Sequence, residues 1–459
     1  MRKILIRSNK NPLIGKIKIN GSKNAILPIT AASVLSDSLV TLHNVPDLID
    51  VHLMSELLKS LGAKVNFIHN KNYKVNHTLE INCSNINNHV ILHETANKLR
   101  ASFLLLGPIL SRFSKARIAF PGGCNIGKRP IDIHIKALEK MGAKIEINDN
   151  SIIAIVKEKL KGREITFEKV SVGATENIIM AAIFAEGMTV INNAAIEPEV
   201  LDLINFLKKM GADINFYDNK MNLLDITSVY NTKIYDESKY DTTFMTRNFG
   251  RGIIAIKGVS TLYGCVHRII SDRIEAGTYA LSAIITGGKL ILEEVDISDI
   301  RCIADELESI GAVIELCDKG IVVSREKNYS IKSTNVATDS YPNFPSDMQP
   351  QLMSAMCIAD GMSVVEENIF EKRFTHVDEL RKLGADIKIE KNKAIINGVK
   401  RLFGTNLHAT DLRSTAALVL ASLVANGETI INDSYHLLRG YEAMHEKLNL
   451  CGADISILD

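Results

Sequence analysis

Apolar residues recur at helical spacing in six stretches of the chain, and each stretch ends in an apolar residue followed by Gly-Ala. Val51, Met54, Leu57 and Leu61 form one such face. This spacing predicts an amphipathic helix with one buried side, and the glycine suits the left-handed residue that closes a helix. The six glycines are Gly62, Gly142, Gly211, Gly311, Gly384 and Gly452.

Short stretches of alternating polar and apolar residues follow these helices. Residues 144–147 and 386–389 are examples, and the alternation predicts half-buried strands. A second apolar helix lies upstream in each copy, and it also ends in a turn before a strand. The pattern therefore predicts six copies of one helix-strand-helix-strand unit and a mixed α/β fold.

The spacing of the repeat predicts two domains. The intervals between successive repeat glycines are 80, 69, 100, 73 and 68 residues, so the long interval separates three copies from three copies. We expect two inside-out, barrel-like α/β domains of three units each, with buried helices and outer sheets. One comprises residues 22–270, and the other residues 1–21 with 271–459. An insertion near 217–250 is interpreted as a surface excursion, with a binding role as the alternative.

Charge and composition exclude several classes of protein. The 459 residues include 54 basic and 53 acidic ones, so no general positive field would attract nucleic acid or an anionic membrane. No apolar run reaches the about 18 residues of a membrane helix, and charge returns too early at the N-terminus for a signal peptide. The seven cysteines form no Cys-x-x-Cys pair, which argues against disulfides and a cysteine zinc site. We expect a cytoplasmic protein with reduced thiols.

Cations stand in the first turn of several predicted helices, where the helix dipole disfavours them. Ser, Thr and Asp at these positions are explained as helix caps. Lys23, Arg100, Arg273 and Arg413 are better explained if anions bind at these helix starts. A nearly neutral protein would then bind anionic substrates through a local basic site.

The segment 121–130 has no counterpart in the other five copies. It holds three glycines between two prolines, and we interpret it as a lid that carries Lys128 and Arg129 over an anion. Cys124 lies beside these cations, which favours a reactive thiolate over an inert thiol. Asp132 follows as a hydrogen-bond acceptor, because a metal site would need more ligands than Asp132 and His134.

With these residues in view, the chain resembles the UDP-N-acetylglucosamine enolpyruvyl transferases of the EPSP synthase superfamily. The similarity covers nearly the whole chain apart from the central insertion, and the superfamily fold agrees with the six repeats. The matching segments are residues 21–25, 121–124, 129–132, 169–175 and 344–349, with His436 and residues 439–442.

The resemblance implies transfer of the enolpyruvyl group of phosphoenolpyruvate to the 3′-hydroxyl of UDP-N-acetylglucosamine, with release of phosphate, in peptidoglycan synthesis. It assigns phosphoenolpyruvate binding to Lys23, Asn24, Arg129 and Arg439, with Arg373 and Arg413 as supporting cations. It assigns nucleotide-sugar binding to Arg100, Arg129, Pro130, Ile131, Asp132, Ile133, Lys169, Ser171, Val172, Gly173, Asp347 and Ile369.

The implied catalytic residues are Cys124, Asp347, Lys23, Arg129 and Arg439. Asp347 is the expected base for the sugar hydroxyl, and Cys124 is the expected acid for the methylene carbon. Cys124 is also expected to hold a phospholactoyl adduct through sulfur. The cations would stabilise charge in the intermediate, and neither step calls for a metal or another cofactor.

Two further readings stay open. The chain could be the shikimate-pathway enolpyruvyl transferase, although Cys124 and Arg129 favour the nucleotide sugar. It could also be an inactive relative that binds nucleotide sugar, against which Lys23 and Arg439 speak. RNA 3′-phosphate cyclases share the architecture distantly, but a net charge of +1 gives no footprint for RNA. The resemblance further implies that the epoxide fosfomycin alkylates Cys124.

Overall fold

The computed structural model describes residues 3–9, 11–70, 76–92, 94–120, 122, 131–217, 223–224, 252–325 and 330–458. These residues divide into two compact units. Unit I holds the described residues from Gly21 to Ile270, and unit II holds those up to Asn20 and from Ser271 onward. The proposed lid and most of the central insertion lie outside the described residues.

The strands of unit I form three sheets. They are β3 (Val40–Val45), β4 (Lys64–Ile68), β5 (His77–Asn82), β6 (Val90–Ile91), β7 (Lys115–Ala119), β8 (Lys144–Ile147), β9 (Ser151–Ile155), β10 (Glu164–Thr166), β11 (Met188–Ala194), β12 (Asp213–Tyr217), β13 (Leu223–Leu224), β14 (Gly252–Lys257) and β15 (Val266–Arg268). The strand orders are β15-β3-β5-β4, β6-β7-β9-β8 and β10-β11-β14-β12-β13.

The strands of unit II form three more sheets. They are β1 (Lys3–Arg7), β2 (Ile14–Lys18), β16 (Lys289–Glu293), β17 (Val313–Cys317), β18 (Gly320–Ser324), β19 (Asn335–Ala337), β20 (Met362–Glu366), β21 (Asp386–Glu390), β22 (Lys393–Asn397), β23 (Asn406–His408), β24 (Glu428–Asn432) and β25 (Ile455–Leu458). The strand orders are β2-β16-β18-β17, β19-β20-β22-β21 and β23-β24-β1-β25.

These six sheets share one pattern of strand pairing, and the sheet that contains β13 adds one further antiparallel pair, β12 with β13. Each begins with a parallel pair, such as β19 with β20, and continues with two antiparallel pairs. The repeat read from the Gly-Ala copies is therefore a repeat of sheet topology.

The helices of each unit lie inside its sheets. Unit I contains α1 (Lys23–Ala32), α2 (Ile49–Leu61), α3 (Glu94–Lys98), α4 (Leu106–Phe113), α5 (Asp132–Lys140), α6 (Val172–Ala182) and α7 (Pro198–Lys209), with short 3₁₀ helices η1 (Ser33–Leu35) and η2 (Arg100–Leu105). Unit II contains α10 (Arg273–Thr286), α11 (Ile297–Ser309), α12 (Gln349–Met356), α13 (Val377–Lys382), α14 (Leu412–Ser422) and α15 (Met444–Leu450), with η3 (Ser346–Met348), η4 (Arg373–His376) and η5 (Ser434–Arg439).

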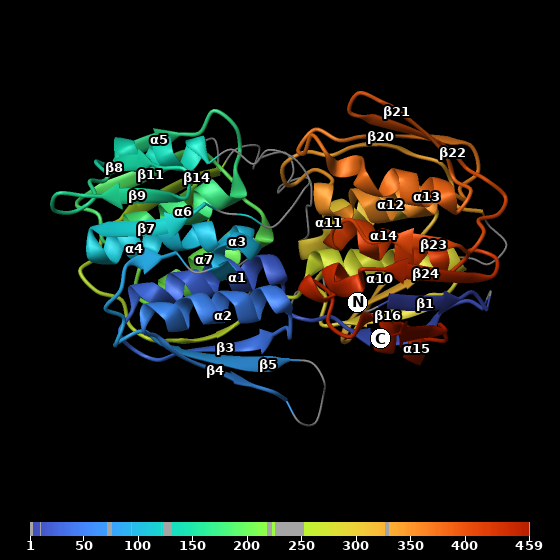
Figure 1. The fold of residues 1–459 in the computed structure, drawn as a ribbon, viewed down its shortest axis with the longest axis horizontal. Coiled ribbons are helices and arrows are strands. Elements are labelled where there is room, and N and C mark those ends of the chain that lie inside the picture. Colours follow the sequence, from blue (N-terminus) through green and yellow to red (C-terminus); the bar gives the residue numbers. More distant parts are fainter. Residues whose placement is uncertain are drawn as a thin grey trace. The chain divides into compact units, whose positions relative to one another are not determined.

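The innermost helices are buried on nearly every side. All residues of α12 and α14 are buried, as are almost all of α10. In Figure 1, β20, β21 and β22 lie on one side of α12 and α14, and β1 and β16 lie on the opposite side of the unit. A helix buried all round needs apolar or small residues on every face, which explains runs such as residues 416–421. The expected α/β fold with buried helices and outer sheets is confirmed.

The six repeat glycines all adopt the expected left-handed backbone. Their φ angles are 106°, 101°, 105°, 103°, 95° and 105° in chain order. Each closes a helix and redirects the chain into a strand, so the glycine is required by backbone sterics at these positions.

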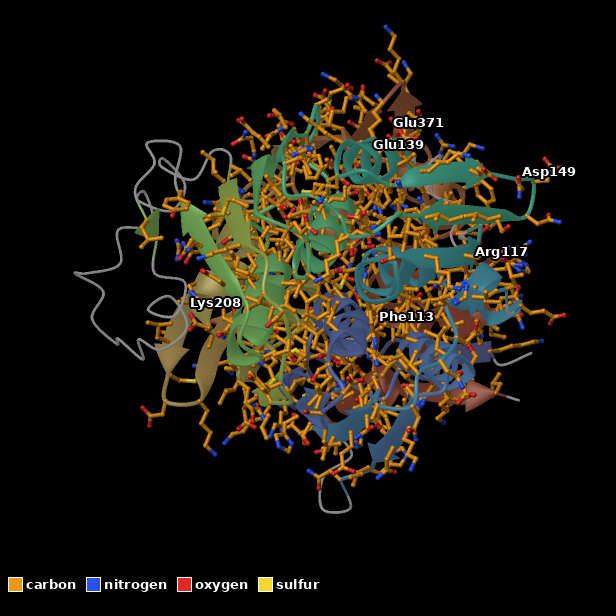
Figure 2. The ribbon with its side chains drawn as sticks, turned by 90° about the vertical axis from the view of Figure 1, so that its left-hand side faces the viewer. Phe113, Arg117, Glu139, Asp149, Lys208 and Glu371 are labelled. Atoms are coloured by element: carbon orange, nitrogen blue, oxygen red, sulfur yellow. The ribbon has the colours of Figure 1, made fainter. Side chains whose placement is uncertain are left out.

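One expectation for the strands is wrong. The alternation in residues 144–147 predicts a half-buried strand, but Ile147 is 55% exposed. The reason is that Ile147 is the last residue of the edge strand β8 and is followed by the exposed residues 148–150, so it lies beyond the packed part of the sheet. Asp149, in the turn between β8 and β9, marks this edge of the unit in Figure 2.

Within the described part of the chain, the backbone passes between the units after Asn20 and after Ile270. The strand before the first crossing, β2, pairs with β16 in unit II, and the strand before the second, β15, pairs with β3 in unit I. Among the described residues, no helix combines the length and the apolar character that crossing a membrane requires.

Candidate functional site

In unit II, Asp347 lies between two buried arginines. Arg373 donates from Nη2 to Oδ1 of Asp347 at 2.9 Å, and Arg413 donates to Oδ2 from Nε at 3.2 Å and from Nη2 at 3.0 Å. The arginine side chains are 2% and 3% exposed, whereas Asp347 is 28% exposed. The carboxylate is therefore fixed from behind and reaches solvent at its front.

A polar network behind Arg413 sets its position. Its Nη1 donates to the Tyr441 hydroxyl at 3.3 Å, and that hydroxyl lies 2.9 Å from Oγ1 of Thr278. Gln351 donates from Nε2 to both Tyr441 and Thr278. Burial alone would lower the pKa of Arg413, but the charge of Asp347, together with Tyr441 and Asp272, outweighs it and the pKa is raised. The guanidinium stays charged although it is buried.

The start of α14 is capped by Asp411, whose Oδ1 accepts from the backbone N–H groups of Arg413 and Ser414. Burial would raise the pKa of Asp411, but the charge of Arg373 and the bonds from Ser414 hold it below its usual range. His376 lies nearby, and burial lowers its pKa to about 4. The cap that orients α14 thus also orients Arg413.

Ile369 is tied to the same region through Glu367. The carboxylate of Glu367 accepts from Oγ of Ser346 and from the backbone N–H groups of Ile369 and Phe370, each at 2.9 Å. The loop that carries Ile369 is thereby held against the residue that precedes Asp347.

In unit I, Lys23 begins α1 and pairs with Asp50 at the start of α2, with 3.0 Å between Nζ and Oδ2. The Lys23 side chain is 13% exposed and Asp50 is 2% exposed. Asn24 follows Lys23 in the first turn of α1 and is half-buried. An ordered lysine at a helix start can present its charge to an anion together with backbone N–H groups.

A second group in unit I surrounds His134 on α5. Its Nδ1 lies 3.2 Å from Nδ2 of Asn177, and its ring meets the ring of Phe103 edge-on at 4.9 Å. Burial, and then the charge of Arg100, lower the pKa of His134 to about 3, so this imidazole is neutral. A Cβ added to Gly173 would lie 3.4 Å from the same ring.

The structure therefore brings Arg100, the first turn of α5 and the start of α6 together around His134. Asp132 and Ile133 lie in that first turn, next to Ile131, and Val172 and Gly173 begin α6. Ser171 caps α6 by accepting from the N–H of Ala174 at 3.3 Å, and Lys169 is exposed just before it.

The remaining expected site residues are Arg439 and three residues of the proposed lid. Arg439 ends η5 in unit II and is half-buried. Burial, and then its charge, lower the pKa of His436. Cys124, Arg129 and Pro130 lie outside the described residues.

Several partners were not predicted from the sequence. Asp50, Tyr441, Thr278 and Gln351 each touch an expected site residue or its support. Asp50 looked like an ordinary acidic residue in the first turn of a helix. No signal in the sequence indicated that it pairs with Lys23.

The cysteines of the described residues are free. Burial raises the pKa of Cys83 and Cys357 to about 12 and that of Cys265 to about 11. Thiols in such surroundings are poor nucleophiles.

Among the described residues, Asp47, His69 and His77 form a group that could hold a metal ion.

Taken separately, the two units offer complementary chemistry. Unit II holds a carboxylate that can accept a proton, backed by cations. Unit I holds the ion pair of Lys23 with the buried Asp50, and a set of groups around a neutral histidine. Both suit anionic substrates, because the cations are pre-positioned and partly shielded from water.

Comparison with known proteins agrees with this chemistry. The family model for EPSP synthase (3-phosphoshikimate 1-carboxyvinyltransferase) matches residues 8–228 and 246–448. A UDP-N-acetylglucosamine 1-carboxyvinyltransferase from Wolbachia sp. subsp. Drosophila simulans is 72% identical over 457 residues, covering 100% of both chains. A protein of the same name from Anaplasma marginale (strain St. Maries) is 45% identical, covering 99% of this chain and 98% of its own.

Among solved structures, the enolpyruvyl transferase NikO from Streptomyces tendae superposes with a TM-score of 0.82 at 21% identity, covering 99% of this chain and 98% of its own. This likeness supports the fold. By the full-length sequence matches, the chain belongs to the EPSP synthase family and, within it, to the UDP-N-acetylglucosamine 1-carboxyvinyltransferases.

Proposed function

We propose that the chain transfers the enolpyruvyl group of phosphoenolpyruvate to the 3′-hydroxyl of UDP-N-acetylglucosamine and releases phosphate. The observation that carries the proposal is the full-length match to relatives that bear this activity in their name. The fixed carboxylate of Asp347 between Arg373 and Arg413 supports it. The reaction would be the first committed step of peptidoglycan synthesis.

The proposed chemistry is an addition followed by an elimination. In the addition, the sugar hydroxyl loses its proton to Asp347 and its oxygen bonds to C2 of phosphoenolpyruvate, while C3 takes a proton from Cys124. In the elimination, the Cys124 thiolate takes a proton back from C3 and the bond between C2 and the phosphate oxygen breaks, so the double bond is restored as phosphate leaves. Two arginines favour the charged form of Asp347, which is the form that accepts a proton.

The expected residues would form two sets, one that binds phosphoenolpyruvate and one that binds the nucleotide sugar. Lys23, Asn24, Arg129 and Arg439 would bind phosphoenolpyruvate, and Arg373 and Arg413 would support them. The group around His134 would contribute to the nucleotide-sugar site through Arg100 and the starts of α5 and α6. No metal or organic cofactor enters this proposal. The six free cysteines of the described residues suit a reducing compartment, and we propose the cytoplasm.

The test is phosphate release from phosphoenolpyruvate with UDP-N-acetylglucosamine as acceptor. Cys124→Ala and Asp347→Ala should each lower turnover by at least about 10²-fold, the usual contribution of a general acid or base. Asp378→Ala, which removes an exposed carboxylate paired with Arg381, should leave turnover unchanged. Full activity in both site variants would overturn the mechanism.

Two other outcomes of this assay would indicate the alternative functions. Phosphate release with shikimate 3-phosphate but not with UDP-N-acetylglucosamine would identify the shikimate-pathway activity. Binding of the nucleotide sugar without any phosphate release would identify an inactive relative.

Fosfomycin is proposed as a covalent inhibitor at Cys124. Intact-mass measurement should show one adduct on the unaltered chain and none on Cys124→Ser. An adduct that persists in Cys124→Ser would contradict this assignment.

A further inference from the structure

Three histidines gather around one aspartate in unit I, apart from the residues proposed to bind substrate. Asp47 lies between β3 and α2, and His52 lies in α2. His69 follows β4, and His77 begins β5. The ligand atoms of Asp47, His69 and His77 all lie within 4.8 Å of one another.

The local fold explains why these residues meet. The pairing of β3 with β5 is irregular between Leu42 and Val45, with Asn44 at a φ of 60°, and Val45 pairs with His77. A bulge of this kind changes the direction in which the following residues point. It brings the start of β5 beside the loop that carries Asp47.

Aromatic packing holds the imidazoles together. The ring of Phe67 on β4 lies 4.9 Å from the ring of His52, 4.9 Å from that of His69 and 5.4 Å from that of His77. The rings of His69 and His77 are 5.2 Å apart. Three imidazoles are thus packed around one side chain that supplies no polar atom.

The cluster combines one carboxylate with the nitrogens of three imidazoles. His52 donates from Nε2 to Oδ1 of Asp47 at 2.5 Å, and Oδ2 of Asp47 lies 3.7 Å from Nδ1 of His69. Asp47 supplies carboxylate oxygens as donors, and the histidines supply ring nitrogens.

The spacing of the donors is close to that of a coordination sphere. Three atoms that lie pairwise within 4.8 Å share a centre no more than about 2.8 Å from each, and zinc bonds to His and Asp measure about 2.0–2.2 Å. Side-chain movements of under about 1 Å would close the site. Two nitrogens and one carboxylate oxygen are typical ligands of zinc and of similar transition metals.

We propose that Asp47, His69 and His77 bind a divalent transition-metal ion of the zinc type. His52 is a positioning residue, because its hydrogen bond orients the carboxylate of Asp47. The ion would clamp the β4–β5 hairpin to the start of α2, the helix in which Asp50 pairs with Lys23. The site is structural and takes no part in the proposed transfer reaction.

Metal binding would change one hydrogen bond. The backbone N–H of Asn70 donates to Nδ1 of His77 at 3.0 Å. Coordination at Nδ1 displaces this N–H directly. Coordination at Nε2 leaves the proton on Nδ1, which then cannot accept. Either way the Asn70 N–H turns away, so its amide resonance should shift when metal binds.

The test is titration of the metal-free full chain with Zn²⁺ by calorimetry, and with Co²⁺ by visible absorption. We expect one equivalent to bind, with a Co²⁺ spectrum that lacks thiolate charge-transfer bands. His69→Gln should weaken binding at least about tenfold, and since His69 is 62% exposed the variant should fold. His43→Gln, at an exposed histidine bonded to Thr78, is the matched control and should bind as the unaltered chain does.

A second measurement guards against misfolding of the variant. Zn²⁺ should raise the thermal unfolding midpoint of the unaltered chain and of His43→Gln but not that of His69→Gln. The proposal is overturned if no Zn²⁺ binds, if Asp47→Asn and His69→Gln bind it as tightly as the unaltered chain, or if Co²⁺ shows thiolate bands. None of these readouts depends on enolpyruvyl transfer, so failure of the proposed function would leave them unaffected.

Discussion

Arg413 shows how one side chain can serve both folding and chemistry. It contacts Oδ2 of Asp347 through two nitrogens and Tyr441 through a third. A lysine at this position keeps the charge but cannot reproduce these directed contacts. Asp347 would then be held less firmly, and its alignment with a substrate hydroxyl would suffer.

We therefore expect Arg413→Lys to lower the turnover of phosphate release by at least about tenfold. Arg381→Lys alters an exposed arginine bonded to Asp378, and it should have no effect on turnover. Steady-state kinetics with both substrates would measure the change. Equal turnover in the two variants would show that Arg413 does not position Asp347.

His134 should make unit I less stable in mild acid. Its folded pKa of about 3 lies below the about 6.5 of an unfolded histidine, so the unfolded chain binds the proton more readily. Stability is therefore complete above pH 6.5 and is lost as the pH falls toward 3. Between pH 7 and pH 5 this one group costs about 2 kcal/mol of unfolding free energy.

Urea unfolding of the full chain at pH 7 and pH 5 would measure this loss. His134→Gln should be less stable at pH 7 but should lose less on acidification, whereas the exposed His43→Gln should follow the unaltered chain. The same pH dependence in His134→Gln and in the unaltered chain would argue against the assignment.

At the level of single residues, the sequence predicted cations better than their partners. Lys23 and Arg413 were unusual because a cation opposes the helix dipole in a first turn. Asp50 is favourable in that position and so carried no signal, although it pairs with Lys23. Pairing between distant residues follows from packing, which local pattern does not encode. For the same reason the four residues of the proposed metal cluster, spread from Asp47 to His77, formed no motif.

At the level of elements, the six glycines have different surroundings despite their common backbone. A Cβ added to Gly142 would meet nothing within 4 Å, whereas one added to Gly62 would lie 2.8 Å from the carbonyl oxygen of Asn85. Both glycines close helices of unit I, after α5 and α2 respectively. The two glycines differ in the room available for a side chain, but they share the left-handed φ.

Gly142→Ala should therefore cost only the backbone strain, about 1–2 kcal/mol. Gly62→Ala should cost clearly more, because a backbone oxygen must also move. Urea unfolding of the two variants would separate strain from contact, with Gly142→Ala as the control for Gly62→Ala. Equal losses would show that the segment at Asn85 yields without cost.

The periodicity of the sequence predicted helices, buried faces and the repeat, because these depend on local pattern. Val51, Met54, Leu57 and Leu61 are all buried, as expected. It did not predict strand order. Residues 144–147 were expected to form a half-buried strand, but the exposure of Ile147 depends on which elements pack over the end of β8, and that packing is a non-local property.

At the level of the whole molecule, the chain crossings after Asn20 and after Ile270 make the units unequal in sequence. All strands of the unit I sheets, β15 included, come from residues between Gly21 and Ile270. Unit II takes β1 and β2 from the start of the chain, and β1 lies between β24 and β25. Ile4, Ile6, Leu13, Ile17 and Ile19 are buried in the core of unit II, so this segment is part of its interior.

A chain of residues 21–270 should therefore fold alone, whereas one of residues 271–459 should not. Without β1 and β2, the latter exposes a sheet with no central strand and an apolar core face. Joining residues 1–20 to residue 271 through a short glycine linker should restore folding, because the carbonyl oxygen of Asn20 lies 2.8 Å from the N–H of Asp272. Amide dispersion in NMR spectra and cooperative urea unfolding would distinguish the three chains. Cooperative folding of 271–459 by itself would show that β1 and β2 are dispensable, and would refute the division at Asn20 and Ile270 as a boundary between autonomous folding units.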